Sequence, residues 1–170
     1  TALFDATGES AWLERANLLA DAINDQFADD TGRLKMAAAD GPLGPIYDSS
    51  DDATPSGESS ALELFARLAR RQPSTEIESR ALTLRSALSG PLSKQPLLRT
   101  DALVGSRLLD EGESGNRRAL AKGTVFVHLR SDHIHLRIAD GWHINAHEPG
   151  QDWLIGADLT GAKAQWPSGA

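Results

Sequence analysis

Residues 51–61 read Asp51-Asp52-Ala53-Thr54-Pro55-Ser56-Gly57-Glu58-Ser59-Ser60-Ala61, and this stretch decides the fold. It combines turn-forming residues, hydroxyl side chains that can cap a helix, and a proline that suits a first helical position. A helix is therefore expected from about Pro55 to Arg71, with Thr54 as its cap and Ser56 as the competing cap. The apolar residues that follow at helical spacing predict its buried face, and these are Leu62, Phe65, Ala66 and Ala69.

Three further helices are expected around this one. Apolar residues recur at three- and four-residue steps in three segments: 10–27 (Trp12, Ala16, Leu19, Ile23, Phe27), 75–88 (Ile77, Ala81, Leu84, Leu88) and 96–109 (Leu98, Ala102, Leu109). Gly90-Pro91 is expected to end the helix that starts near residue 75. Residues 33–53 show no periodicity and predict an irregular loop.

The period changes from helical to alternating after residue 118. Apolar and polar residues alternate over 125–130 and 133–138, which predicts two strands joined at Ser131-Asp132. Residues 141–145 and 153–155 predict two shorter strands. The fold class is therefore α+β, with a helical region at 1–110, a linker at 111–118 and a small antiparallel β region at 119–170.

The β region is too small to be stable alone. Its apolar set is expected to pack on the helix at 96–109 or on a second copy of the chain, and this set is Val125, Val127, Ile134, Leu136 and Ile138. Because an unpaired strand edge favours strand addition, a homodimer through this region is the alternative to packing on the helices.

Composition excludes several classes of function. The 170 residues carry a net charge of -7 with scattered basic residues, which argues against nucleic acid as a partner. No apolar run is long enough to span a membrane. Cysteine is absent, so disulfides, thiolate nucleophiles and cysteine-based metal sites are excluded, and no cofactor is expected. The chain starts at Thr1 without Met, as an excised fragment or a processed chain would.

Several segments resemble one known family. Thr7-Gly8-Glu9, Trp12-Leu13, Phe27-Ala28-Asp29 and above all residues 51–57 resemble the C-terminal region of thioredoxin-domain-containing proteins related to spermatogenesis-associated protein 20. The resemblance covers about residues 5–110 and implies part of an (α/α)6 toroid like that of N-acylglucosamine 2-epimerases and six-hairpin glycosidases. It also implies that the partners of this region are a thioredoxin-like domain and the remaining toroid segments. The family has Asn at the positions of Asp52 and Glu58.

A second, shorter resemblance lies in the β region. Gly141-Trp142-His143-Ile144-Asn145, with Pro149 and Leu154-Ile155 after it, resembles the N-terminal immunoglobulin-like domain of the membrane thiol:disulfide interchange reductases. Such a sandwich needs about one hundred residues. About fifty are present here, so the resemblance implies an incomplete or degenerate copy.

Three groups of residues are candidates for a functional site. Asp51, Asp52 and Glu58 could act as acid and base on a sugar, although carboxylates before a helix also simply stabilise its N-terminus. Contacts to a ligand are expected from Tyr47, Ser56, Trp142 and His143. The histidines at positions 128, 133 and 135 could converge on zinc, although alternation places them on a solvent face.

Three hypotheses for function follow from these candidates. The first is a structural or ligand-binding module, with carbohydrate as the ligand class. The second is part of the active site of a sugar epimerase, isomerase or glycosidase-like enzyme, with Asp51, Asp52 and Glu58 in its cavity; the isolated chain is not expected to be a complete catalyst. The third is a metal-binding module built on His128, His133 and His135.

Overall fold

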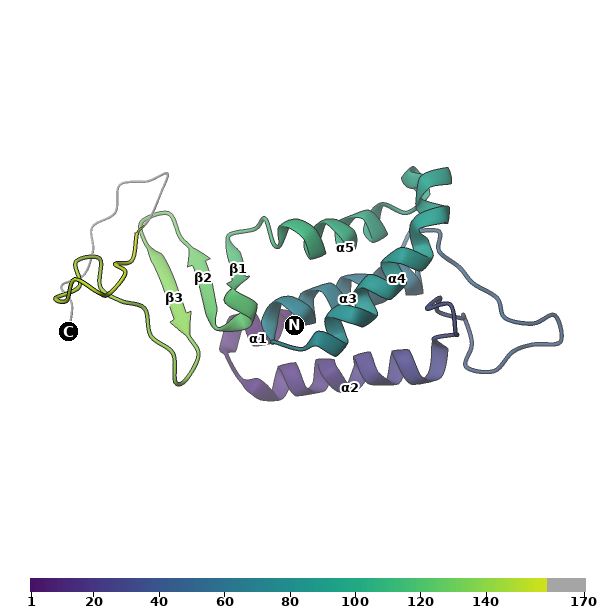
Figure 1. The fold of residues 1–170 in the computed structure, drawn as a ribbon. Helices are drawn as coiled ribbons and strands as arrows, with labels where there is room; N and C mark the ends of the chain where they lie inside the picture. The colour runs from purple at the N-terminus through teal and green to yellow at the C-terminus, as the bar shows by residue number, and fades with distance from the viewer. Residues whose placement is uncertain (159–170) are drawn as a thin grey trace.

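The computed structural model describes residues 1–158 and has an α+β fold, as the sequence predicts. Within that range, five α-helices lead into a three-stranded antiparallel sheet (Figure 1). The elements are α1 (Ala2–Thr7), α2 (Ser10–Phe27), α3 (Gly57–Arg71), α4 (Thr75–Lys94), η1 (Pro96–Leu98), α5 (Thr100–Glu111), β1 (Arg117–Leu120), η2 (Ala121–Gly123), β2 (Val125–Leu129) and β3 (Ile134–Ile138). None of the helices within residues 1–158 is long and apolar enough to cross a membrane.

Helix α3 is the centre of the helical part, and α2, α4 and α5 pack around it (Figure 1). Leu62, Phe65 and Leu68 of α3 are almost completely buried. Helix α5 approaches α3 closely at Gly105, where a Cβ atom would lie 3.0 Å from Leu62 Cγ. The expected buried face is therefore confirmed, since Leu62, Phe65 and Ala66 are buried and Ala69 packs against the core.

The apolar stripe of α4 is confirmed in full, whereas that of α2 is only partly correct. Ile77, Ala81, Leu84 and Leu88 are all buried. In α2, Ala16 and Ala20 are buried, but Leu19 is 63% exposed. The reason is that α2 contacts α3 along one narrow face, and no other described helix covers the side on which Leu19 lies.

Two predicted helix limits are wrong. Helix α4 continues through Gly90-Pro91 to Lys94, because Leu92 packs against the core and this burial stabilises one more turn. Helix α3 begins at Gly57, so Thr54 and Pro55 lie outside it. Ser56, the competing cap of the prediction, is confirmed, because its side-chain oxygen accepts a 3.1 Å hydrogen bond from the Ser59 N–H.

The helix expected at 96–109 is also displaced. It divides into η1 and α5, and Leu98 is 47% exposed because it belongs to the separate turn. Ala102 is buried and Leu109 packs on the core, as expected.

The sheet has the strand order β1-β2-β3. The hairpin between β2 and β3 has the expected turn, with Val127 opposite Leu136 and His128 opposite His135. Strand β1 was not expected, since it starts inside the predicted linker. Residues 141–145 and 153–155 are turns and irregular chain rather than strands. The last twelve residues of the predicted β region lie outside the described residues.

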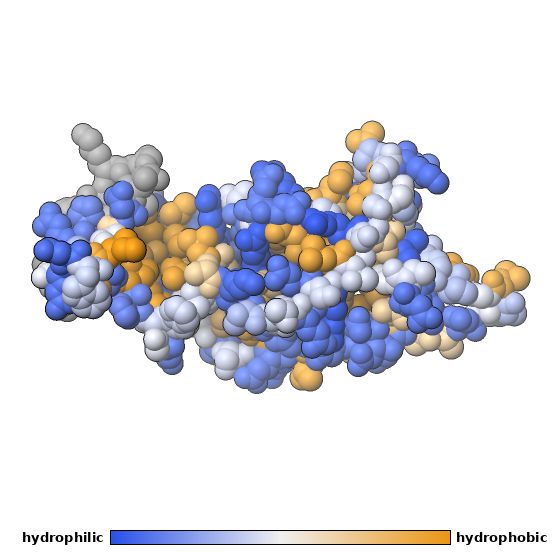
Figure 2. Space-filling view, in the orientation of Figure 1, coloured by the Kyte–Doolittle hydropathy of each residue, from blue (hydrophilic) through white to orange (hydrophobic). Residues whose placement is uncertain are grey.

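The sheet contacts the helices through the face opposite to the expected one. Phe126 of β2 packs edge-to-face against Phe4 of α1 at 5.2 Å, and the Arg137 guanidinium lies 4.6 Å from the Phe126 ring centroid. The predicted apolar set is on the other face, where Ile134 and Leu136 remain 38% and 42% exposed. Figure 2 shows hydrophobic residues exposed over this end of the molecule. The expectation that this set packs on the helices is therefore wrong.

A buried arginine connects the helical part to the sheet. The Arg71 side chain at the end of α3 is 1% exposed and donates to both carboxylate oxygens of Asp5 and, at 2.5 Å, to Glu113. Glu113 also accepts a hydrogen bond from the Ala119 N–H of β1. At Gly123 of η2, a Cβ atom would lie only 1.9 Å from the Arg71 carbonyl oxygen, so a side chain there would separate the two parts.

Shortening Phe65 to alanine tests the assignment of α3 as the centre of the core. We expect Phe65→Ala to lower the free energy of unfolding by about 3 kcal/mol, because it leaves a cavity between α2, α3 and α4. Leu18→Ala is the matched control, since Leu18 is 68% exposed, and it should change stability by about 0.5 kcal/mol or less. Urea denaturation followed by circular dichroism measures both, and equal midpoints for the two variants would contradict the assignment.

Replacing Arg71 by methionine tests the connection between helices and sheet. We expect Arg71→Met to cost about 3 kcal/mol or more, because Asp5 and Glu113 lose the cation that compensates their burial. Amide hydrogen exchange in β2 should accelerate together with that in α1. Arg107→Met removes an exposed arginine that pairs with Glu111 and should leave exchange unchanged. Unaltered protection of β2 in Arg71→Met would show that the sheet is held by other contacts.

Candidate functional site

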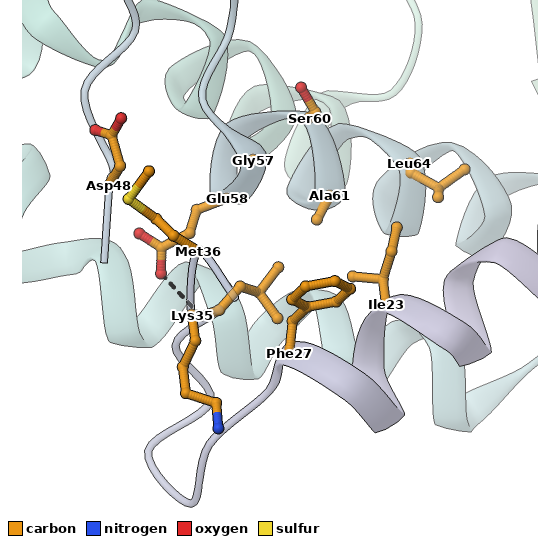
Figure 3. Close-up of a pocket in the computed structure, with 11 residues that line it drawn as sticks. Ile23, Phe27, Lys35, Met36, Asp48, Gly57, Glu58, Ser60, Ala61 and Leu64 are labelled. Carbon is orange, nitrogen blue, oxygen red and sulfur yellow. Dashed lines mark hydrogen bonds between the residues drawn. The ribbon is translucent and has the colours of Figure 1, made fainter. Parts of the chain in front are cut away.

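A groove of about 500 Å³ lies between α2, the N-terminal half of α3 and the loop that joins them (Figure 3). Its floor is apolar. The residues that line it are Ile23, Phe27, Leu34, Lys35, Met36, Asp48, Gly57, Glu58, Ser60, Ala61 and Leu64.

Glu58 fixes the loop against the start of α3. Its carboxylate is 1% exposed and accepts hydrogen bonds from Arg33 Nε at 2.6 Å, Arg33 Nη2 at 2.8 Å and the Leu34 N–H at 3.0 Å. Glu58 is in the first turn of α3, where the helix dipole also favours a negative charge. The predicted catalytic candidate is thus fully engaged in a buried ion pair.

Asp51 joins the N-termini of two helices. One carboxylate oxygen accepts from the Ser56 N–H before α3 at 2.9 Å, and the other accepts from the Asp101 N–H in α5 at 2.8 Å. Burial by itself raises the pKa of Asp51, but the hydrogen bonds from Ser56, Ser59 and Asp101 outweigh it and lower that pKa below its ordinary value. Asp51 is therefore a helix-capping carboxylate.

A second carboxylate holds the far end of the loop. Asp29 accepts hydrogen bonds from the Tyr47 hydroxyl, from the Thr31 N–H and hydroxyl, and from the Arg33 N–H. Arg33 in turn lies 4.7 Å from the Tyr47 ring centroid. Burial by itself raises the pKa of Asp29, but the hydrogen bonds from Tyr47, Thr31 and Arg33 outweigh it and lower that pKa to about 2. The hydrogen bond to Asp29 raises the pKa of Tyr47.

Two polar side chains at the groove keep free positions for a ligand. Asp48 is exposed and accepts one hydrogen bond, from the Ser50 N–H at 3.1 Å. Ser60 is exposed on α3. The Lys35 ammonium points away from the groove in Figure 3 and pairs with Asp40 at 3.1 Å. The groove can therefore present a carboxylate and a hydroxyl above an apolar floor.

The structure brings together only some of the predicted site residues. Asp51, Ser56 and Glu58 all lie at the start of α3, but the first two serve as caps. Asp52 is exposed, and its N–H donates to the Thr54 carbonyl. Tyr47 lies in the loop and contacts Asp29 and Arg33. Trp142 and His143 are exposed in the segment after β3 and do not line the groove.

The histidines of the hairpin form no metal centre. Among residues 1–158, no group of three or more His, Cys, Asp or Glu side chains could hold a metal ion. His133 Nδ1 contacts Asp132 at 2.8 Å, and His128 and His135 face each other across β2 and β3.

Sequence reasoning missed Arg33 and Asp29, whereas Asp48 was one of the carboxylates considered before the helix start. The residues Asp29-Asp30-Thr31-Gly32 favour turns and end the helix at 10–27. They also form the pattern of a turn in which an aspartate accepts from the backbone two residues on, as Asp29 does from Thr31. Nothing local marks Arg33 as the partner of a glutamate 25 residues later.

No protein-family model matches this chain, and no curated protein matches it at a significant level.

The pKa of Asp29 gives a prediction for acid stability. Because its folded pKa is about 2 and its ordinary value is 3.8, Asp29 stabilises the fold above about pH 4, and this contribution is lost as the pH falls towards 2. We expect Asp29→Asn to cost about 1 kcal/mol at pH 6, after allowance for solvent screening, and progressively less from pH 4 to pH 2. Urea denaturation across this range measures the difference.

The control for this prediction is the neighbouring exposed carboxylate. Asp30→Asn removes an exposed carboxylate of the same turn and should change the free energy of unfolding at pH 6 by about 0.5 kcal/mol or less. A pH-independent difference for Asp29→Asn would contradict the assignment.

Proposed function

We propose that this chain is a structural and ligand-binding module, that its ligand is a carbohydrate, and that the groove between α2 and α3 is the binding site. The observation that carries the proposal is the combination in one groove of an apolar floor with the exposed Asp48 carboxylate and Ser60 hydroxyl. Pockets with a mostly apolar lining and few polar groups are typical of small-molecule sites.

The state of the carboxylates supports binding rather than complete catalysis. Glycoside hydrolysis uses two carboxyl groups that flank the scissile bond, one of which must exchange a proton. Asp51 is held by two backbone N–H groups, and Glu58 is held by Arg33 and the Leu34 N–H. Neither carboxylate is free to transfer a proton to a sugar, and Asp48 has no second free carboxylate beside it in the groove lining.

The chemistry of the groove suits a sugar ring. A pyranose has an apolar C–H face and a rim of hydroxyl groups. Phe27, Ile23 and Leu64 offer an apolar surface to the ring face. Asp48 can accept from hydroxyl groups, and Ser60 can both donate and accept.

We propose further that residues 1–110 belong to the toroid of the thioredoxin-domain-containing proteins that they resemble. The exposed Leu18 and Leu19 on α2, at 68% and 63%, are the surface that further helices would cover. The structural role and the binding role are then compatible, because α2 contributes to both surfaces.

Filling the groove tests the proposal. We expect mono- and disaccharides to perturb the backbone amide resonances of groove residues, and Ser60→Trp to weaken that binding at least about tenfold by occupying the site. Ser89→Trp, on an exposed position of α4 outside the groove, is the matched control and should bind as the unmodified chain does. Heteronuclear NMR titration measures both variants.

Two results would contradict the proposed function. The first is a panel of neutral and acidic sugars that leaves the groove resonances unmoved. The second is a sugar whose affinity Ser60→Trp and Ser89→Trp change equally.

A further inference from the structure

One face of the sheet carries a row of basic side chains. Arg117 of β1, His128 of β2 and His135 of β3 are direct neighbours across the three strands. Because side chains alternate along a strand, Arg130 and His133 project from the same face toward the hairpin turn. We call these five residues the cationic face.

The cationic face is the part of this side of the sheet that α1 does not cover, since Phe126 and Arg137, on the same side, pack against Phe4. Arg117, Arg130, His133 and His135 are exposed, and His128 is half-buried. The pKa of His128 is lowered by desolvation and then by the charges of Arg117, Arg130, His135 and His133. One imidazole therefore experiences all the other members of the face. Asp132, at the turn beside His133, is the acidic neighbour.

The charge of this segment is opposite to that of the helical part. Residues 116–138 contain five Lys or Arg and one Asp, which gives +4 before any histidine is protonated. Residues 1–111 contain 18 Asp or Glu and 11 Lys or Arg, which gives -7. Of these five cations, Arg117 and Arg130 belong to the cationic face, whereas Arg118 lies on the opposite face of the sheet, Lys122 pairs with Glu78, and Arg137 packs on Phe4 and Phe126.

We infer that the cationic face binds an acidic polysaccharide, a polymer of uronic acids, at a surface separate from the groove. Arginine and protonated histidine donate charge-assisted hydrogen bonds to carboxylates. Neighbouring strands are about 4.8 Å apart, so the face offers a flat array of donors in rows. A chain of sugars with one carboxylate each can lie across such an array and contact several rows. The inference stands whether or not the groove binds a sugar.

Other occupants fit the face less well. A single-stranded nucleic acid would need an aromatic platform for its bases, and the aromatic ring on this face, Phe126, is covered by Phe4 and Arg137. A metal cation would be repelled by Arg117 and Arg130.

A titration of the full chain with defined oligomers tests the inference. The probe is a hexamer of galacturonic acid at low ionic strength and pH 6.5, and its fully methyl-esterified form is the neutral control. We expect the acid to bind at least about tenfold more tightly than the ester, and the double variant Arg117→Gln/Arg130→Gln to weaken binding at least about tenfold. The matched double variant Arg107→Gln/Lys94→Gln removes two exposed cations from α5 and α4 and should change affinity less than about twofold. Calorimetry measures the affinities, and circular dichroism confirms the fold of each variant.

NMR provides an independent readout. Bound carboxylates offset the charges of Arg117 and Arg130, so the pKa of His128 should rise on addition of the hexamer, and binding should strengthen as the pH falls through that pKa. Equal binding of acid and ester, or full affinity in Arg117→Gln/Arg130→Gln, would overturn the inference. Tighter binding of hexaglutamate or of a thymidine hexanucleotide than of the uronate would overturn it in favour of those partners.

Discussion

The arrangement of this protein depends on one buried cation. Arg71 ends α3 inside the structure, where an unpaired guanidinium would be strongly unfavourable, so its burial requires carboxylates from elsewhere in the chain. Asp5 from α1 and Glu113 from the segment before β1 provide them. Since Glu113 also accepts from the Ala119 N–H, satisfying Arg71 fixes the N-terminal helix and the first strand at once. The sheet therefore has a defined position although its apolar face does not contact the helices.

Predictions from sequence were correct where the deciding interactions are local in the chain, and wrong where they join residues far apart in sequence. The stripe of α4 is correct because four buried residues at helical spacing are a local property of the chain. Leu19 was misassigned because the width of the buried face on α2 depends on how many helices surround it. Pro91 failed to end α4 because Leu92 gains burial beyond it, which no local preference reveals. Strand β1 was missed because its position is set by Glu113 and by pairing with β2.

The candidate site shows the same difference between local and long-range interactions. Acidic residues around a helix start were recognised from sequence, and both capping and catalysis were considered for them. The choice between the two depended on partners far along the chain: Arg33 for Glu58, and the Asp101 N–H for Asp51. The basic residues near the C-terminus were treated as scattered because they are separated in sequence. Antiparallel pairing places Arg117 beside His128, so that the two side chains lie on one face of the sheet.

The two proposed binding surfaces lie at opposite ends of one rigid element. Glu58 in the first turn of α3 borders the groove, and Arg71 in its last turn holds the segment that leads into the sheet. Fifteen residues of α-helix span about 22 Å, so the surfaces are separated by a fixed distance and share no side chain. If both proposals hold, ligands at the two surfaces do not compete. A single polymer with neutral and acidic sugars that reached both would bind the second surface as an intramolecular event, at a high effective concentration. Because α3 is a stiff helix, the distance between the two surfaces does not adapt to the ligand. The gain in affinity would therefore depend on whether the polymer is long enough to reach both surfaces.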